Sequence, residues 1–480
     1  MTAGRQHYRV TLGVLTVAAT AFAVQQTLVF PALPTLQREL SVSAVSATWV
    51  LTVFLLSAAV LTPILGKLGD QYGKERLLVV SLGLFLVGSI GAAAAPGIET
   101  LIVFRAVAGA GGAVFPLSFG IIRDEFPPER VKVGIGLLSA VFGVGGGIGI
   151  VASGVIVDHL SWRWLFVIGA IPVAVVIVLV HRFVPESPVR SRTRLDLPGA
   201  LLFASALVSL LLGLTKGTDW GWTSPGVIGL AAAALMFGIV FVRTELVSDH
   251  PMVDMRLMAR REVALPNLAA LITGFALFGT FVLAPQFVEA PYELPAKTAS
   301  LVNYGFGATA TGAGLYLLPS SLMMLFAGPA AGLLGRRFGS KWPLTIGLFL
   351  VALGAGILGE FHHARWQIVV AMLVLGVGVG FAFAAMAALV TEGVPVTETG
   401  VATGMNTVMR TVGAVIGSQV MAAILTVTTI PGTSVPSESA FSHAFMLAAG
   451  AAAVGAVLGL LVTPLRNGRN QRSPLALEAE

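Results

Sequence analysis

Four polar side chains, Gln25, Gln26, Arg105 and Arg410, lie deep inside long apolar stretches of this sequence. A glutamine amide donates and accepts hydrogen bonds but does not titrate, and an arginine guanidinium only donates. Each is costly in an apolar environment unless it has a partner or a wet cavity. The four residues therefore indicate substrate contacts, control of a proton path or gating, or hydrogen bonds between neighbouring helices.

Acidic side chains are absent from the middle of these stretches. All 23 Asp and Glu residues fall in polar segments or at the ends of the apolar stretches. A buried carboxylate whose pKa changes between two conformations is the simplest group for coupling a process to protons. The sequence offers no such group at mid-depth, so proton coupling would have to use acids at the ends, such as Asp124 or Glu289.

Catalytic and metal-binding patterns are not evident. The sequence contains neither H-E-x-x-H nor G-x-S-x-G, so we expect no catalytic residues. It has no cysteine, which excludes disulfides and thiolate ligands. The adjacent His362 and His363 could suggest a metal, but no acid or further histidine follows them at ligand spacing. We therefore expect no metal site and no cofactor.

The elements that must position these residues are membrane-spanning helices. The chain has 480 residues, of which 56% are hydrophobic and only 11% charged, against about 25% in soluble domains. Its apolar runs are too long for barrel strands, so we expect an all-α polytopic membrane protein with fourteen transmembrane helices. The predicted spans are 10–33, 45–65, 77–95, 98–122, 134–157, 164–181, 199–215, 225–243, 264–288, 309–331, 343–360, 366–390, 401–427 and 441–464.

Basic residues alternate in number along the segments between these spans. With the N-terminus inside, the inner segments hold 22 Lys and Arg residues and the outer loops five. This bias places both termini in the cytoplasm, and we expect a multi-pass protein of the plasma (inner) membrane. Residues 10–23 also resemble a signal peptide, but the apolar run continues past Ala23, which favours an uncleaved first helix.

An internal repeat divides the chain into two related parts. The stretch GKLGDQYGKE at 66–75 resembles GLLGRRFGSK at 332–341, and each joins the second and third spans of a six-span set. Repeated halves around a midplane site are typical of secondary transporters. We expect an N-terminal six-helix bundle at 1–182, an inserted helix pair with linkers at 183–262, a C-terminal six-helix bundle at 263–465, and a disordered cytoplasmic tail at 466–480.

These motifs resemble those of the major facilitator superfamily, in its fourteen-helix drug:proton antiporter branch. The loop at 66–75 resembles the superfamily's Gly-x-Leu-x-Asp-x-x-Gly-Arg/Lys signature, and Arg105 with Gly109 is similar to its Arg-x-x-x-Gly motif. The stretch GVGGGIGIVASG is similar to the branch's antiporter motif, and RLDLPGALL and TGMNTVMRTVG are also typical of it. The resemblance covers about residues 8–465 and implies a major facilitator fold.

The resemblance implies a charged gate at the inner side. A relay between Asp70, Lys74 and Asp124 would hold that gate closed in the outward-facing state, with Gly66 and Gly73 permitting tight turns. An ordinary charged cytoplasmic turn is the alternative. The antiporter-like motif contains Gly145, Gly149 and Gly154, and spacings such as Gly145-x-x-x-Gly149 would let helices touch backbone to backbone. The branch's usual Gly-Pro is Gly149-Ile150 here, so the kink from that proline is not expected.

The first span departs from the branch in a way that affects coupling. Gln25 stands where the branch commonly has Asp, and Phe30 stands where it commonly has Asn. Because the superfamily places the first and fourth spans side by side, we expect Gln25 to accept a hydrogen bond from Arg105. The alternative is a bond between helices with no part in transport.

These observations predict export of hydrophobic or amphiphilic small molecules by alternating access, with proton antiport as the family's default. The alternatives are a lipid or lipid-like exporter with weak or no proton coupling and, remotely, a polytopic membrane enzyme. Gln25, Gln26, Phe30, Arg105 and Arg410 are the expected cavity residues. We expect the small-molecule substrate, protons and the lipid bilayer as partners, no nucleic acid, and a monomer.

Overall fold

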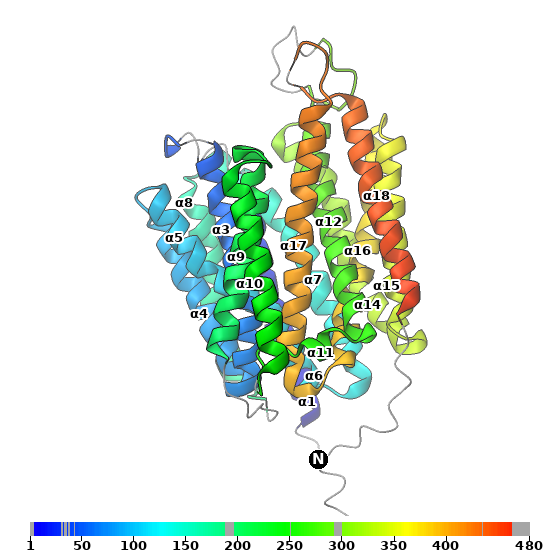
Figure 1. Ribbon diagram of the computed structural model, residues 1–480. Helices are drawn as coiled ribbons and strands as arrows, with labels where there is room; N and C mark the ends of the chain where they lie inside the picture. The colour runs from blue at the N-terminus through cyan, green and yellow to red at the C-terminus, as the bar shows by residue number, and fades with distance from the viewer. Residues whose placement is uncertain are drawn as a thin grey trace, which may run out of the picture.

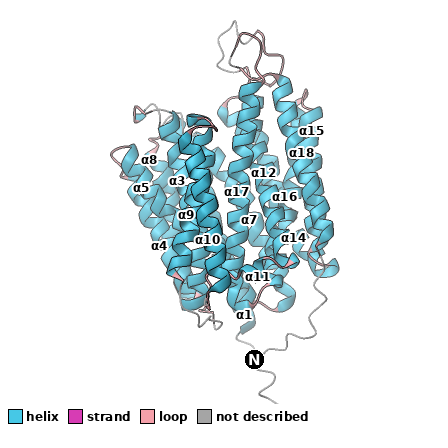
Figure 2. Ribbon diagram, viewed as in Figure 1, coloured by secondary structure: helices cyan, strands magenta, loops and turns pink. Residues whose placement is uncertain are grey.

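The computed structural model describes residues 4–29, 32, 36, 39–42, 44–187, 196–249, 251–291, 300–433 and 435–462. Within these ranges it contains fourteen helices long and apolar enough to cross a membrane and no sheet, which confirms the predicted all-α polytopic fold (Figure 2). Helices satisfy every backbone hydrogen bond internally, as the bilayer requires. Phe30 and the predicted tail at 466–480 lie outside the described residues.

The segment from residue 4 to residue 183 forms the helices of the N-terminal bundle. They are α1 (Gly4–Thr27), α3 (Ala44–Tyr72), α4 (Lys74–Ala93), α5 (Ile98–Ala108), η1 (Gly109–Ala113), α6 (Val114–Glu125), α7 (Pro128–His159) and α8 (Arg163–Phe183). The fourth span, predicted as one helix at 98–122, is interrupted by the 3-10 turn η1, whose glycines lie against α3.

The remaining helices form the inserted pair and the C-terminal bundle. They are α9 (Leu197–Trp220), α10 (Pro225–Val247), α11 (Met255–Met258), α12 (Arg261–Glu289), α14 (Ala310–Phe338), α15 (Lys341–Glu360), α16 (Arg365–Gly393), η2 (Val396–Glu398), α17 (Thr399–Val427) and α18 (Glu438–Leu461). Four of these helices have an N-cap side chain that accepts a hydrogen bond from a backbone amide of the first turn. These residues are Asp196 for α9, Ser224 for α10, Thr309 for α14 and Ser437 for α18.

The two bundles lie side by side (Figure 1). We call the end at which α1 begins the lower end, and the opposite end, at which α3 begins, the upper end. The most extensive contacts between the bundles are those of α7 with α14 and of α3 with α17, and α7 also packs against α16 and α6 against α17. The inserted helix α9 packs against both α3 and α17, and α10 packs on α9. The inserted pair therefore covers the α3–α17 side of the interface between the bundles.

The internal repeat is visible in the backbone. Gly73 follows α3 with φ 117°, and Gly339 follows α14 with φ 90°. Residues other than glycine rarely adopt these angles, so each glycine allows the chain to reverse within a single residue. Both amide groups also donate to the carbonyl four residues back, to Gly69 at 3.0 Å and Gly335 at 2.9 Å. The matched sequences thus form matched turns at the lower ends of the two bundles.

Candidate functional site

A cavity of about 240 Å³ lies between the bundles in the upper half of the molecule. Its lining comes from α1, α3, η1, α6, α9, α12 and α17, so both bundles and the inserted helix α9 contribute. The wall is mostly apolar, with amide and hydroxyl groups from Gln26, Thr52, Thr411 and Gln419. Of the described residues that line it, Arg410 alone carries a full charge.

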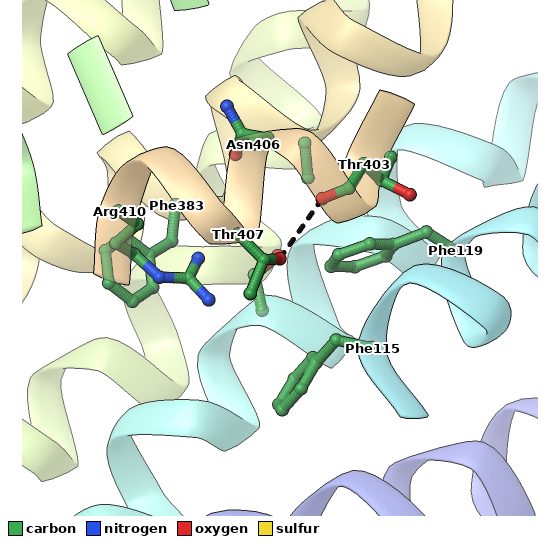
Figure 3. A pocket seen from close by; sticks show the side chains of 9 residues that line it. Phe115, Phe119, Phe383, Thr403, Asn406, Thr407 and Arg410 are labelled. Atoms are coloured by element: carbon green, nitrogen blue, oxygen red, sulfur yellow. Dashed lines mark hydrogen bonds between the residues drawn. The ribbon is translucent and has the colours of Figure 1, made fainter. Parts of the chain in front are cut away.

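Arg410 lies at the base of this cavity, where a second space of about 10 Å³ begins. Phe115, Thr407 and Arg410 line both spaces. The Arg410 guanidinium lies over the Phe383 ring, 4.6 Å from its centroid (Figure 3). A cation over an aromatic face is stabilised by the ring's charge distribution, which lowers the cost of burying it. The second space is large enough for about one water molecule.

The adjacent glutamines face different surroundings because successive residues on a helix are rotated by about 100°. Gln26 lines the cavity, whereas Gln25 is fully buried against α8. The Gln25 Nε2 group donates to the Phe166 carbonyl at 3.3 Å, and its amide fills the space beside Gly169. In this conformation Gln25 therefore lies outside the cavity lining in which we expected it.

Arg105 is likewise buried between helices rather than exposed to the cavity. Its Nε group donates to the Val50 carbonyl at 3.2 Å, and the guanidinium lies 3.9 Å from the centroid of the Phe54 ring. Neither the Gln25 Oε1 atom nor the Arg105 Nη2 atom has a hydrogen-bond partner among the described residues. The predicted Gln25–Arg105 bond is therefore wrong for this conformation, in which each side chain bonds a backbone carbonyl on another helix.

At the lower end, the three charged residues of the expected gate lie together. The Lys74 Nζ atom lies 2.7 Å from Asp124 Oδ2 and 3.4 Å from Asp70 Oδ1, and the side chains of all three are inaccessible to solvent. Asp70 and Lys74 were predicted in a loop, but they lie in the last turn of α3 and the first residue of α4. Only Gly73 separates the two helices, so Asp70 and Lys74 are four residues apart and their side chains meet across this single turn.

The Asp70 carboxylate also forms hydrogen bonds with the C-terminal bundle. It accepts hydrogen bonds from the backbone amides of Gly400 at 3.0 Å and Val401 at 3.3 Å, in the first turn of α17. The exposed amides and the dipole of a helix N-terminus favour a carboxylate there. Gly66 makes the approach possible, since a Cβ atom built on it would lie 2.6 Å from the Gly400 carbonyl oxygen.

Two basic residues of the N-terminal bundle, not singled out from the sequence, also bond to the C-terminal bundle. Arg123 donates to the Val394 carbonyl at 2.8 Å and to Thr399 Oγ1 at 2.7 Å. Lys132 pairs with Glu392 at 2.8 Å and donates to the Gly335 carbonyl at 3.2 Å. Both were counted only as part of the basic inner segments, because nothing in the sequence shows which carbonyls the fold brings to them.

A further polar contact at the lower end comes from the segment after α8. Ser187 donates a hydrogen bond to the Asp124 carboxylate, and Glu186 accepts one from the Glu75 amide at 3.3 Å. Arg76 lies 3.6 Å from the same Glu186 carboxylate. This segment therefore ties the linker toward α9 to the charged cluster, a connection that the sequence does not reveal.

The glycines of α7 form two interleaved faces. Gly145 and Gly149 face α1, where a Cβ atom on Gly149 would lie 2.7 Å from the Val24 carbonyl oxygen. Gly143 and Gly147 face α14, where a Cβ atom on Gly147 would lie 2.6 Å from Ser321. On each face the two glycines are four residues apart. One face of α7 therefore packs closely on α1 of its own bundle, and the other face packs closely on α14 of the C-terminal bundle.

Gly154 differs from the other glycines of the antiporter-like motif. A Cβ atom built on it would lie 3.4 Å from the Thr311 hydroxyl, which is ordinary contact. The Gly145-x-x-x-Gly149 spacing was expected to allow close backbone approach, and the geometry leaves no room for a side chain at either position, whereas it leaves room at Gly154.

Comparisons with known proteins agree with this architecture. The family model described as the Major Facilitator Superfamily matches residues 15–318 and 267–478. Multidrug resistance protein 3 of Bacillus subtilis (strain 168) is 30% identical over 295 residues, which are 61% of this chain and 54% of that protein. The tetracenomycin C resistance and export protein of Streptomyces glaucescens is 26% identical over 348 residues, 71% of this chain and 61% of that protein.

A longer alignment is found with multidrug resistance protein Stp of Mycobacterium tuberculosis (strain CDC 1551 / Oshkosh). It is 29% identical over 433 residues, 90% of this chain and 70% of that protein. The chain thus spans only 54% and 61% of the length of the Bacillus and Streptomyces relatives.

Two solved structures share the fold. The human organic anion transporter MFSD10 has a TM-score of 0.66 at 15% identity, covering 94% of this chain and 99% of that one. The proton:xylose symporter XylE has a TM-score of 0.66 at 14% identity, covering 96% and 97%. The chain therefore belongs to the Major Facilitator Superfamily, whose solved members named here are transporters rather than enzymes.

Proposed function

We propose that this protein exports hydrophobic or amphiphilic small molecules across a plasma membrane by alternating access. One observation carries the proposal: the cavity lies in the upper half between the bundles, above a lower end closed by contacts that cross between them. A transporter that alternates access needs such a cavity closed toward one side only. The relatives named for drug resistance and export support the direction of transport.

The orientation follows from the charges. The segments at the lower end hold most of the basic residues, and such segments stay on the cytoplasmic side. We assign the lower end to the cytoplasm, with both chain termini. The arrangement then represents the outward-facing state, and the bonds of Asp70, Arg123 and Lys132 keep the cytoplasmic side closed.

The cavity lining indicates the charge of the substrate. A cation in an apolar, poorly solvated wall disfavours ligands of the same sign and favours anionic or neutral ones. Since Arg410 is the one charged side chain among the described lining residues, we propose a preference for neutral or anionic amphiphiles over lipophilic dications.

Proton coupling is proposed from the family resemblance. No acid lies among the described residues that line the cavity, and Gln25 does not titrate. Coupling would therefore act through acids at the helix ends, of which Asp124 bonds to the charged cluster at the lower end. Flux in proteoliposomes with and without an imposed pH gradient measures this coupling directly.

Lipid export is the competing function, and the structure gives it little support. A lipid would enter sideways from the bilayer, through a gap between the bundles. On one side α9 packs against both α3 and α17 and itself contributes Leu211 and Thr215 to the cavity wall. On the other side α7 contacts α14 along both its middle and its upper part, at Gly147 and Gly154. Both routes are covered in this conformation.

The deciding experiment is a panel of toxic compounds tested on a bacterial host that lacks its own efflux pumps. Expression of this chain should raise tolerance to neutral and anionic amphiphiles, and Arg410→Gln at matched expression should reduce the advantage of the anionic compounds. Robust resistance to a dicationic dye would count against the substrate preference. Absence of any tolerance, together with lipid movement in reconstituted vesicles, would favour the lipid exporter.

A further inference from the structure

Three metal-ligating side chains meet at the upper end of the C-terminal bundle. His362 and His363 lie between α15 and α16, and Glu438 is the first residue of α18, 76 residues beyond His362. The Glu438 Oε1 atom lies 3.0 Å from His362 Nε2 and 3.4 Å from His363 Nδ1. One ligand atom from each residue lies within 4.8 Å of the others. The acid that the sequence did not supply near the histidines is thus brought to them by the fold.

These separations suit a tetrahedral ion. Zinc binds histidine nitrogen and carboxylate oxygen at about 2.0–2.1 Å, so two ligand atoms of one tetrahedral site lie about 3.3 Å apart. The two distances from Glu438 bracket that value. The cluster therefore needs little movement of its side chains to take up an ion.

The orientation of His362 supports the same conclusion. Its Nδ1 atom is 2.8 Å from the Leu358 carbonyl, and its ring stands edge-on to Phe287 with centroids 5.0 Å apart. A histidine that donates Nδ1–H to a carbonyl presents the Nε2 lone pair to a metal, which is the usual outer contact of metal-binding histidines. His362 is almost fully buried, so packing holds this orientation.

One polar neighbour of Glu438, Tyr304, bonds to the backbone and does not compete as a ligand. Tyr304 donates its hydroxyl to the Pro436 carbonyl at 2.7 Å. Burial, with a smaller contribution from the negative charge of Glu438, raises the pKa of Tyr304 to about 12. Its hydroxyl therefore stays protonated and bonded to the backbone near neutral pH, while the more exposed His363 leaves the cluster accessible from solvent.

We propose that His362, His363 and Glu438 form a binding site for a divalent cation of the zinc class, with water as the fourth ligand. The ion would join the start of α16 to the start of α18 at the upper end, away from the transport cavity. The site does not depend on the proposed export function, since its ligands lie outside the cavity lining.

The test is metal binding by the full chain, purified in detergent without a polyhistidine tag. Co²⁺ serves as the probe because tetrahedral Co²⁺ has visible absorption bands, and Zn²⁺ serves as the competitor. The wild type should bind one Co²⁺ per chain and release it to Zn²⁺. His363→Ala should weaken binding roughly tenfold or more, because it removes a ligand from an exposed position.

Two further variants keep the test decisive. His443→Ala is the matched control, since His443 is an exposed histidine on α18 outside the cluster, and it should bind as the wild type does. Glu438→Gln keeps the side-chain size and should weaken binding as His363→Ala does. His362→Ala is avoided, because that buried ring packs against Phe287.

Zn²⁺ should raise the thermal unfolding temperature of the wild type and of His443→Ala but not of His363→Ala. Equal binding by wild type and His363→Ala, or no saturable binding by the wild type, would overturn the proposal. Either result would leave the cluster as a histidine–glutamate ion pair only.

Discussion

At the scale of single residues, Gln25 and Gln26 show how one step along a helix separates two roles. Gln25 fills a space beside Gly169 and bonds the Phe166 carbonyl, while Gln26 contacts the cavity. Two identical neighbours therefore offer a matched pair of positions, one for helix packing and one for substrate contact.

We expect Gln25→Met to leave the range of exported compounds unchanged. The variant keeps the shape of the side chain and loses one hydrogen bond, about 1 kcal/mol, while removing an oxygen that has no partner among the described residues. Gln26→Leu should instead shift the ratio of tolerated neutral to anionic compounds. Tolerance profiles and thermal unfolding of both variants check this, and a changed profile for Gln25→Met alone would refute the assignment.

Asp70 carries the second prediction at this scale. Asp70→Asn removes the charge that pairs with Lys74 and faces the amides of α17, so the closed lower end should be weakened and export abolished. The protein should still reach the membrane, because Lys74 keeps its 2.7 Å pair with Asp124 and the lost helix cap itself costs only about 1 kcal/mol. Glu129→Gln, at an exposed acid in the first turn of α7, is the control. Normal efflux by Asp70→Asn at matched expression would exclude the gate.

At the scale of elements, α7 joins its two neighbours through glycines rather than through large side chains. A methyl group at Gly149 would overlap the Val24 carbonyl oxygen and the Thr27 hydroxyl. A methyl group at Gly146 would lie 3.8 Å from Thr27, in ordinary contact. The two positions therefore differ in the space beside the helix although both are glycines of one motif.

Gly149→Ala should lower the stability of the folded protein by roughly 1–3 kcal/mol, because the added methyl group forces α1 and α7 apart. Gly146→Ala should be neutral or slightly stabilising, since alanine is the better helix former. The measurement is the thermal unfolding midpoint of each variant purified in the same detergent. Equal midpoints would show that α1 and α7 do not pack as closely as described.

At the scale of the whole molecule, the two ends of the bundle interface differ. Asp70, Arg123 and Lys132 bond across the interface at the lower end, and the cavity occupies the upper half. If the lower contacts broke and α3 and α17 came together at the upper end, the cavity would open toward the lower end instead. The balance between the two sets of contacts thus determines which side of the membrane the cavity faces.

Cysteine labelling tests this orientation, because the natural chain contains no cysteine. In intact cells, a membrane-impermeant maleimide should label Ser418→Cys, whose position lines the cavity, and a bound substrate should slow the reaction. Ser118→Cys, at a fully buried position in α6, should stay unlabelled and serves as the control. Labelling of Ser418→Cys only in inside-out vesicles would reverse the proposed orientation.

The sequence by itself determined the class of protein, the fourteen spans and the paired turns. Hydrocarbon imposes long apolar helices, so composition and run length were sufficient for the spans. The repeated glycines at Gly73 and Gly339 need a backbone angle that other residues avoid, which is why their turns could be matched from letters alone. The grouping of Asp70, Lys74 and Asp124 followed from the family resemblance.

Only the tertiary structure decided which polar groups meet. Gln25 lies on the face of α1 that packs against α8 and not on the face that lines the cavity. Arg105 contacts the Val50 carbonyl and the Phe54 ring and does not contact Gln25 through a hydrogen bond. Glu438 reaches His362 across 76 residues because the end of α15 lies beside the start of α18. Backbone carbonyls and distant side chains leave no local pattern in a sequence, so contacts of this kind depend on how the helices pack.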